Sequence, residues 1–202
     1  MHIDVLGLLC YNNEFLKPYE RRCHMVAQES SSPVQVEVVS GDIAQVKADA
    51  LITLINSGGM WFGGIDGVIE RNAGSLFHRQ AATQELHDGM VVIATATGFQ
   101  HGGEFGDVIF VVDDLRQPLH QLVEAGLKAA DEAGYESVTL PAMRMGVMLG
   151  AFEKTIDEAV GEMVLGLKSV IGGFESLESV TFVVYDNLTA EYALKTALEA
   201  QH

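Results

Sequence analysis

The chain has 202 residues, of which 48% are hydrophobic and 20% are charged, the composition of a globular domain with one well-buried core. Its 28 Asp and Glu against 12 Lys and Arg give a formal net charge of −16, which argues against a nucleic-acid-binding surface because phosphate backbones are bound by Lys and Arg. We also expect no membrane partner, since no apolar run approaches the ~20 residues of a membrane span.

Residues 1–33 differ from the rest of the chain and end in Q-E-S-S-S-P, which is typical of a linker or turn. The start, M-H-I-D-V-L-G-L-L-C-Y, has no basic region and carries an acid at position 4, so it does not resemble a signal peptide. We interpret residues 1–33 as an N-terminal extension without an assigned role and residues 34–202 as the functional domain. The chain has only two cysteines, and we expect a cytoplasmic protein.

The cysteines and histidines of the extension do not form a recognisable metal motif. His2, Cys10, Cys23 and His24 follow no zinc-ligand spacing. We therefore interpret the cysteines as ordinary thiols and expect no metal site and no cofactor.

From position 34 onward, strand patterns alternate with helix patterns. V-Q-V-E-V-V alternates apolar and polar residues, as a half-buried strand does, whereas A-D-A-L-I-T-L-I is nearly all apolar and suits a strand covered on both faces. The patterns predict strands over 34–39, 48–55, 90–97, 107–112, 137–141 and 180–185, and helices over 68–73, 77–86, 117–133, 152–170 and 189–200. Such alternation predicts an α/β sandwich with a largely parallel sheet.

Two glycine-bearing loops, 56–67 and 142–150, each follow a predicted strand and precede a predicted helix. Ligands of open α/β sheets bind beyond the carboxyl ends of the strands. We therefore expect both loops at the same rim of the sheet.

The first of these loops, N-S-G-G-M-W-F-G-G-I-D-G, has five glycines among its twelve residues. A glycine-rich turn that leads into a helix offers backbone N–H groups at the positive end of the helix dipole, and so predicts an anion site. The loop contains neither G-x-x-x-x-G-K-[ST] nor G-x-G-x-x-G, so the common nucleotide fingerprints do not apply. The alternative is a tight strand–helix connection without a ligand.

Four motifs occur in an order that resembles the macro domain family. They are G-D-I at 41–43, A-D-A-L-I-x-x-x-N at 48–56, G-G-I-D-G-V-I-E-R-N-A-G at 63–74 and P-A-M-R-M-G-V at 141–147. The resemblance runs from about residue 34 to the C-terminus. It implies a three-layer α/β/α sandwich with a mixed, largely parallel central sheet. It also implies binding of ADP-ribose, either free or attached to a protein.

The resemblance also implies roles for individual residues. Asp42 corresponds to the acid that reads adenine, Ile43 would flank the base, and Tyr185 matches an aromatic position beside it. Asn56 matches an asparagine near the distal ribose. The residues that match the two diphosphate loops are Gly63, Gly64, Ile65, Gly146 and Val147. Taken by themselves, Asp42 also fits a turn cap after a strand, and Tyr185 fits strand-end packing equally well.

Asp66 is the candidate catalytic residue. In family members that hydrolyse ADP-ribosyl esters, an acid at this position and the asparagine matched by Asn56 lie near the distal ribose. A carboxylate there could orient or deprotonate a water. The alternative is a helix-start carboxylate that only favours the helix dipole.

The sequence departs from the family pattern mainly around the expected distal ribose. Small or hydroxyl-bearing residues are replaced by bulkier ones, and one aromatic and one asparagine are lost. The departures are Thr53, Leu54, Ile55, Trp61, Phe62, Arg144, Met145 and Met148. They bear on hydrolysis more than on binding.

Two of the departures each have two interpretations. The guanidinium of Arg144 could pair with a diphosphate oxygen and replace the lost hydroxyl donors, or it could face the solvent. Trp61, the only tryptophan, could cover the ligand as a lid or form a dimer contact. The sequence leaves the oligomeric state open.

Three functions follow from these observations. The first is a module that binds ADP-ribose or an ADP-ribosylated protein. The second is a hydrolase that removes ADP-ribose from acyl or carboxylate linkages, with Asn56 and Asp66 as catalytic residues. The third is a diverged fold that acts only in protein interaction.

Overall fold

The computed structural model describes residues 34–58 and 64–200. Several sequence predictions concern residues outside these ranges. The residues concerned are His2, Cys10, Cys23, His24, Trp61, Phe62 and Gly63.

Six strands and five α-helices alternate along the described chain. The strands are β1 (Gln35–Ser40), β2 (Ala48–Ile55), β3 (Val91–Ala94), β4 (Phe105–Val112), β5 (Ser137–Pro141) and β6 (Ser179–Val184). The helices are α1 (Ile65–Ala73), α2 (Leu76–Ala81), α3 (Leu119–Glu132), α4 (Ile156–Val170) and α5 (Leu188–Glu199), with two short 3-10 helices, η1 (Ile43–Gln45) and η2 (Ile171–Gly173). No helix in these ranges has the length and apolar content needed to cross a membrane.

The strands form one sheet in the order β1-β6-β5-β2-β4-β3. All neighbouring pairs are parallel except β3 and β4, which are antiparallel. The predicted mixed, largely parallel sheet is therefore confirmed. Because β1, β6, β5, β2 and β4 run in one direction, their carboxyl ends meet at one rim of the sheet.

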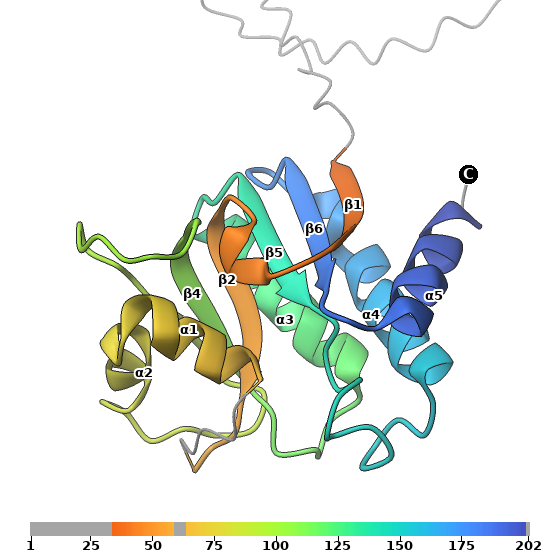
Figure 1. Cartoon of the computed structure of the whole chain (residues 1–202), viewed down its shortest axis with the longest axis horizontal. Helices are drawn as coiled ribbons and strands as arrows, with labels where there is room; N and C mark the ends of the chain where they lie inside the picture. Colours follow the sequence, from red (N-terminus) through yellow and green to blue (C-terminus); the bar gives the residue numbers. More distant parts are fainter. Residues whose placement is uncertain (1–33, 59–63, 201–202) are drawn as a thin grey trace, which may run out of the picture. The chain divides into compact units, whose positions relative to one another are not determined.

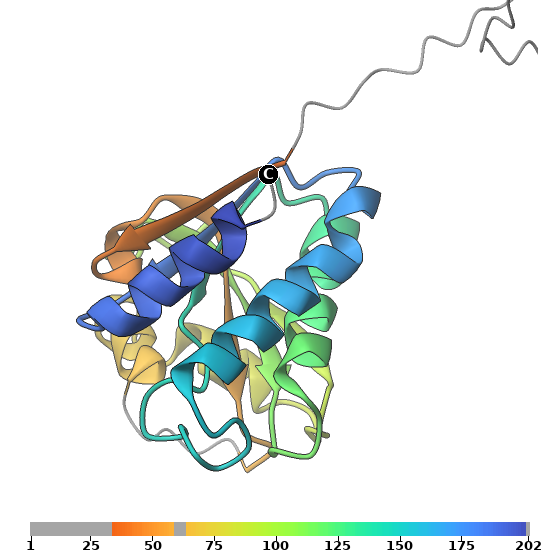
Figure 2. The same cartoon turned by 90° about the vertical axis from the view of Figure 1, so that its right-hand side faces the viewer.

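Helices cover both faces of the sheet, which gives the predicted three layers. Helices α1 and α2 lie on one face, and α3, α4 and α5 lie on the other (Figures 1 and 2). Each face has its own hydrophobic core cluster, one built around α3, α4 and α5 and the other around η1, α1 and α2. The near-continuous apolar sequence of β2 follows from this arrangement, since alternate residues of the strand enter the two clusters.

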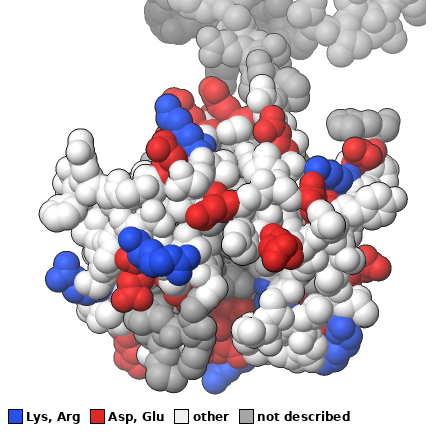
Figure 3. Space-filling view, viewed as in Figure 1, with Lys and Arg blue, Asp and Glu red and all other residues white. Residues whose placement is uncertain are grey.

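The surface is acidic, as the composition requires. On the face shown in Figure 3, the Lys and Arg side chains lie apart from one another, among Asp and Glu side chains. No continuous basic patch forms on that face within the described residues. An anionic ligand that binds there must find positive potential from another source.

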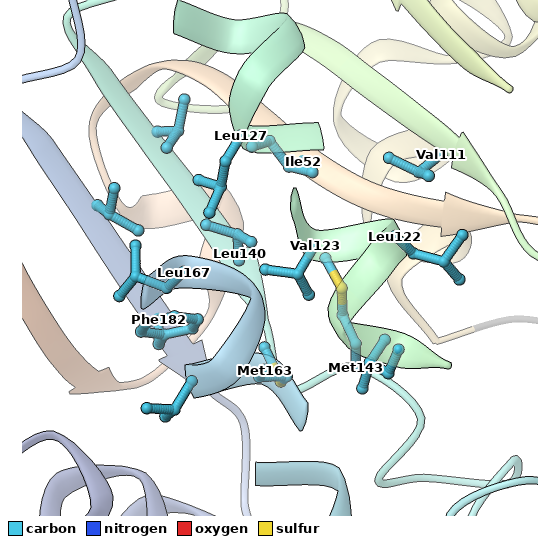
Figure 4. Close-up of a cluster of buried hydrophobic side chains, with 14 of the residues drawn as sticks. Ile52, Val111, Leu122, Val123, Leu127, Leu140, Met143, Met163, Leu167 and Phe182 are labelled. Atoms are coloured by element: carbon cyan, nitrogen blue, oxygen red, sulfur yellow. The ribbon is translucent and has the colours of Figure 1, made fainter. Parts of the chain in front are cut away.

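The larger core cluster reaches the rim through a methionine. Met143, which lies just after β5, inserts among Leu122, Val123 and Met163 of α3 and α4 (Figure 4). Its side chain is 3% exposed. Burial of a methionine contributes roughly 1.5–3 kcal/mol, so the start of the β5–α4 loop (residues 142–155) is anchored in the core.

The helix expected over 117–133 runs over Leu119–Glu132, and two other predicted helices are each four residues shorter than their sequence patterns indicated. The helix expected over 77–86 ends at Ala81, because the next four residues are exposed and offer no apolar face to the core. The helix expected over 152–170 begins at Ile156, where the Thr155 side chain accepts a hydrogen bond from the Glu158 amide and caps the helix. Both differences arise from local capping and burial that periodicity alone does not register.

Helices α3 and α4 approach each other closely at a glycine. A Cβ atom added to Gly166 would lie 2.5 Å from the backbone oxygen of His120. Since a backbone atom cannot move aside as a side chain does, only glycine fits at this crossing.

Candidate functional site

The loops that follow the parallel strands are joined to one another at the rim. The Gly41 amide donates to the Val184 oxygen at 3.0 Å, which ties the ends of β1 and β6 together. The Asp113 amide donates to the Ile55 oxygen at 2.7 Å and does the same for β4 and β2. The predicted common rim is confirmed for the described parts of the two loops, residues 56–58, 64–67 and 142–150, because β2 and β5 are parallel neighbours.

Asp42 caps the 3-10 helix that follows β1. Its Oδ1 accepts a hydrogen bond from the Ala44 amide at 3.0 Å. The residue is exposed, and within the described chain Oδ2 accepts no hydrogen bond. The turn-cap interpretation is thus confirmed, while one oxygen is left for an external donor such as the amine of adenine.

Ile43 and Tyr185, the two residues predicted beside the base, differ in exposure. The Ile43 side chain is 5% exposed and belongs to the core cluster under η1, so most of it is not available to a ligand. Tyr185 directly follows β6 and is 76% exposed. The strand-end packing interpretation of Tyr185 is therefore wrong, and its ring is free to stack.

The helix that follows Tyr185 carries two further exposed apolar side chains, which sequence reasoning missed. Leu188 and Tyr192, one turn apart on α5, are 81% and 74% exposed. Their i, i+4 spacing is the signal that could have identified them, because it places both on one helix face.

The N-terminus of α1 is uncapped. Gly64, the N-cap residue, has φ 58° and ψ −128°, and no side chain accepts a hydrogen bond from the first turn. This backbone conformation is accessible essentially to glycine alone. Within the described residues, the first-turn amides of Ile65 and Asp66 donate to no protein acceptor, so they lie open at the positive end of the helix, as an anion site requires. Ile65 itself is half-buried against the core.

Asp66 is paired with a histidine from the next helix. Its Oδ1 lies 3.4 Å from Nε2 of His78, and the two side chains are 15% and 6% exposed. The His78 ring also contacts Phe110 of β4, with ring centroids 5.1 Å apart. In the described residues Asp66 Oδ2 accepts no hydrogen bond, so it faces a potential water or sugar hydroxyl. No sequence motif marks His78; the packing of α2 against α1 reveals it.

Asn56, the second predicted catalytic residue, follows β2 directly and is half-buried. The next residue fixes this loop to the β4–α3 connection: the Ser57 amide donates to Asp114 Oδ1 at 3.0 Å. That hydrogen bond is the main reason that the pKa of Asp114 lies below its ordinary value.

The second predicted phosphate turn lies in the β5–α4 loop. Gly146, Val147 and Met148 are all exposed, Val147 by 94%. The turn is closed by a hydrogen bond from the Leu149 amide to the Gly146 oxygen at 3.0 Å. Within the described residues, the amides of 146, 147 and 148 donate to no protein acceptor. Three successive open amides can bind an anion.

The position of Arg144 agrees with neither of the two interpretations of its sequence. Its side chain is 1% exposed, so it does not face solvent, and its nitrogens are already engaged. Nε and an Nη atom donate to the two Asp113 oxygens at 2.8 and 2.7 Å, and Nη atoms also donate to Glu153 at 2.8 Å and to the Gln117 oxygen at 3.0 Å. Four of the five N–H groups are used. The prediction that Arg144 contacts a diphosphate is therefore corrected.

The other departures from the family pattern also point mostly inward. Thr53 and Met145 are 1% and 6% exposed, and the Thr53 hydroxyl has no hydrogen-bond partner among the described residues. Of these departures that the structure describes, only Met148, at 40% exposure, is open at the surface.

A cavity of the described chain lies away from this rim. It has a volume of about 560 Å³ and includes Lys47, Asp49, Glu104 and Asp107 in its lining. These residues lie at the amino ends of β2 and β4, opposite the rim described above. We assign the candidate site to the rim, because open amides and exposed aromatic and carboxylate groups converge there.

The chain was compared with protein-family models, with curated proteins and with solved structures. No family model matches the chain. The chain is 32% identical to the O-acetyl-ADP-ribose deacetylase of Escherichia fergusonii over 124 residues, covering 56% of this chain and 69% of that protein. It is 24% identical to the ADP-ribose glycohydrolase of Archaeoglobus fulgidus over 181 residues, covering 80% and 91%. The Trypanosoma brucei macrodomain in complex with ADP superposes with a TM-score of 0.70 at 18% identity, covering 83% of this chain and 72% of that one, which shows a shared fold.

Proposed function

Because the chain belongs to the macro domain family, we propose that it binds ADP-ribose, as a free metabolite or attached to a protein, at the carboxyl rim of its sheet. One observation supports the proposal above all others. Two turns at the carboxyl rim, the α1 N-terminus at Gly64–Asp66 and the β5–α4 turn at 146–148, offer backbone amides that donate to no acceptor within the described residues.

The proposed ligand spans the rim from β1 to β2. Asp42 Oδ2 accepts a hydrogen bond from the amine of adenine, and Tyr185 stacks on the base. The diphosphate lies between the two amide turns, which follow the paired strands β2 and β5. The distal ribose then lies toward Asn56 and Asp66. The free Asp42 oxygen and the 76% exposure of Tyr185 support this orientation.

The electrostatics of the chain favour amides over cationic side chains as the anion-binding groups. The formal net charge is −16, and Arg144, which lies two residues before the second turn, is already paired with Asp113 and Glu153. Backbone amides and a helix dipole supply local positive potential without changing the net charge. A nucleotide diphosphate can therefore bind to this acidic domain.

The test is calorimetry with four ligands that share parts of one molecule. We expect ADP-ribose and ADP to bind, AMP to bind more weakly and ribose 5-phosphate to bind weakest, since it lacks the base. Equal binding of unrelated anions, or no binding of ADP-ribose at millimolar concentration, contradicts the proposal. The second outcome favours the protein-interaction alternative.

Hydrolysis of an ADP-ribosyl ester is a second candidate function. It is supported by the Asp66–His78 pair: a half-buried carboxylate oriented by a histidine keeps one oxygen available for a water near the distal ribose. The names of two relatives, a deacetylase and a glycohydrolase, are consistent with such chemistry.

The hydrolase candidate is tested with O-acetyl-ADP-ribose and with a protein ADP-ribosylated on Asp or Glu. Turnover by the wild type that falls at least a hundredfold in Asp66→Asn, with ADP-ribose affinity unchanged, supports catalysis. Binding of ADP-ribose without turnover of either substrate indicates a module that only binds. Turnover that survives in Asp66→Asn refutes the role of Asp66.

A further inference from the structure

The strongest unassigned feature of the rim is the buried ion network around Arg144. It joins three points of the chain: Asp113 at the end of β4, the Gln117 oxygen just before α3, and Glu153 near the start of α4. The side chains of Arg144, Asp113 and Glu153 are 1%, 7% and 4% exposed. Such burial sets the network apart from ordinary surface ion pairs.

We propose that Arg144 is a positioning residue for the phosphate turn at 146–148. It holds the β5–α4 loop in the shape that directs the turn's open amides toward a diphosphate. The inference rests on the proposed function for its ligand. It adds that this chain orients the turn by an internal ion network, where the family pattern has hydroxyl side chains.

The position of Arg144 in the chain supports this role. It lies between Met143, which is anchored in the core, and the exposed turn that begins at Gly146. Its backbone has φ 57°, an unfavourable conformation for a non-glycine residue. The conformation persists because the side chain is held on several sides, including by the ring of Phe152, 5.1 Å from the guanidinium carbon.

The geometry of the network explains why an arginine is needed. The guanidinium makes a bidentate contact with Asp113 and extends to Glu153 nine residues further along the chain. A planar fork can make both contacts at once, whereas a lysine ammonium is a single point charge. Burial alone would lower the pKa of Arg144, but hydrogen bonds and the charges of Asp113 and Glu153 raise it above its ordinary value. The arginine therefore stays charged.

The balance of charge excludes a direct ionic role in ligand binding. The network contains one cation and two carboxylates, so Arg144 brings no net positive charge to the turn. Met145, the next residue, also points inward. The turn itself therefore offers an anion its backbone amides, and their orientation depends on how the loop is held.

The first arm of the test needs no ligand. Amide resonances of the uniformly ¹⁵N-labelled protein are compared for wild type, Arg144→Lys and Arg79→Met, an exposed arginine on α2 that serves as the control. We expect Arg144→Lys to shift or broaden the amides of 146–148 and leave those of Gly64 and Ile65 unchanged. Unchanged 146–148 amides in folded Arg144→Lys overturn the inference.

The second arm measures affinity for ADP and for adenosine, which lacks phosphates. If Arg144 positions the turn, the affinity for ADP falls at least fivefold in Arg144→Lys and at least tenfold in Arg144→Met. The affinity for adenosine changes by no more than twofold in either variant. Equal losses for both ligands, or no loss for ADP, overturn the inference in favour of a purely stabilising role.

Two further outcomes are distinguishable. If Arg144→Met does not fold, Asp113→Asn replaces it in the experiment, because asparagine has the shape of aspartate but removes one charge from the network. We then expect a fivefold loss of affinity for ADP and no loss of affinity for adenosine. If the wild type binds no nucleotide, the proposed function fails, while the ligand-free amide spectra still decide whether Arg144 orients the turn.

Discussion

Asp42 caps the η1 helix with one carboxylate oxygen and, in the proposed complex, binds adenine with the other. The substitution Asp42→Asn removes only the second role. Its Oδ1 accepts the Ala44 amide at 3.0 Å, while Oδ2 is free among the described residues. In Asp42→Asn, the single amide oxygen is taken by Ala44, because asparagine caps as well as aspartate does. The NH₂ group then faces the adenine amine, and two donors meet. Asp42→Ala removes both tasks.

The expected magnitudes differ for the two variants. The carboxylate–amine hydrogen bond is charge-assisted and contributes roughly 1.5–3 kcal/mol when desolvated. Asp42 is exposed until a base covers it, so we expect the lower end, about 1.5 kcal/mol, which weakens the Kd for ADP-ribose roughly tenfold. Loss of the cap in Asp42→Ala costs a further ~0.5–1 kcal/mol of folding stability, whereas Asp42→Asn leaves stability unchanged.

The assay combines calorimetry with chemical unfolding. Affinities for ADP and for inosine diphosphate, whose base has an oxygen in place of the amine, are measured for wild type, Asp42→Asn and Glu132→Gln. The last removes the same charge from an exposed position at the far end of α3. We expect the preference for ADP to shrink or reverse only in Asp42→Asn. An unchanged preference in that variant refutes the assignment of Asp42 to adenine.

Three further predictions concern the framework of the site. Gly64→Ala should lose about 1–3 kcal/mol of unfolding free energy and bind ADP-ribose more weakly, because φ 58° with ψ −128° is strained for alanine; equal stability in a denaturant titration argues against this backbone. Gly166→Ala should also cost about 1–3 kcal/mol, because its Cβ would lie 2.5 Å from the His120 oxygen, but ADP-ribose affinity should not change; a loss of affinity without a loss of stability contradicts the packing argument. Burial alone would raise the pKa of Asp131, but backbone amides at 175–177 outweigh it and lower that pKa. The ionised Asp131 carboxylate therefore stabilises the fold at pH values above its unfolded pKa of about 3.9, and this stabilisation is lost as the pH falls through the lower folded pKa. If the unfolding free energy of Asp131→Asn depends on acid pH in the same way as that of the wild type, the prediction is wrong.

The fold was largely predictable because its elements are long and strongly patterned. β2 is apolar along most of its length because both of its faces are buried, whereas α3 is amphipathic because only one of its faces is buried. The antiparallel β3 was not specified by its own sequence, since strand direction depends on the connection to β4. The start of α4 was placed four residues too early, because apolar residues in the preceding loop continue the helical pattern.

The site was less predictable than the fold. The strained backbone of Gly64 agrees with the glycine-rich sequence of its loop, because essentially only glycine adopts this conformation, whereas the ligand roles of the glycines and aspartates remain predictions. Arg144 was misplaced, because its partner Asp113 lies 31 residues away in sequence. His78 was missed for a similar reason: it reaches Asp66 only through the contact of two helices. Long-range side-chain partners are set by topology, which periodicity does not encode.

The central claim is that open amides of two neighbouring turns bind the diphosphate. A titration of ¹⁵N-labelled protein with ADP, followed by amide chemical shifts, tests it most directly. The account predicts that the largest shifts occur at Gly64–Asp66 and at 146–148. Saturable binding with those amides unmoved, and with shifts confined to the cavity around Asp49 and Asp107, would contradict it.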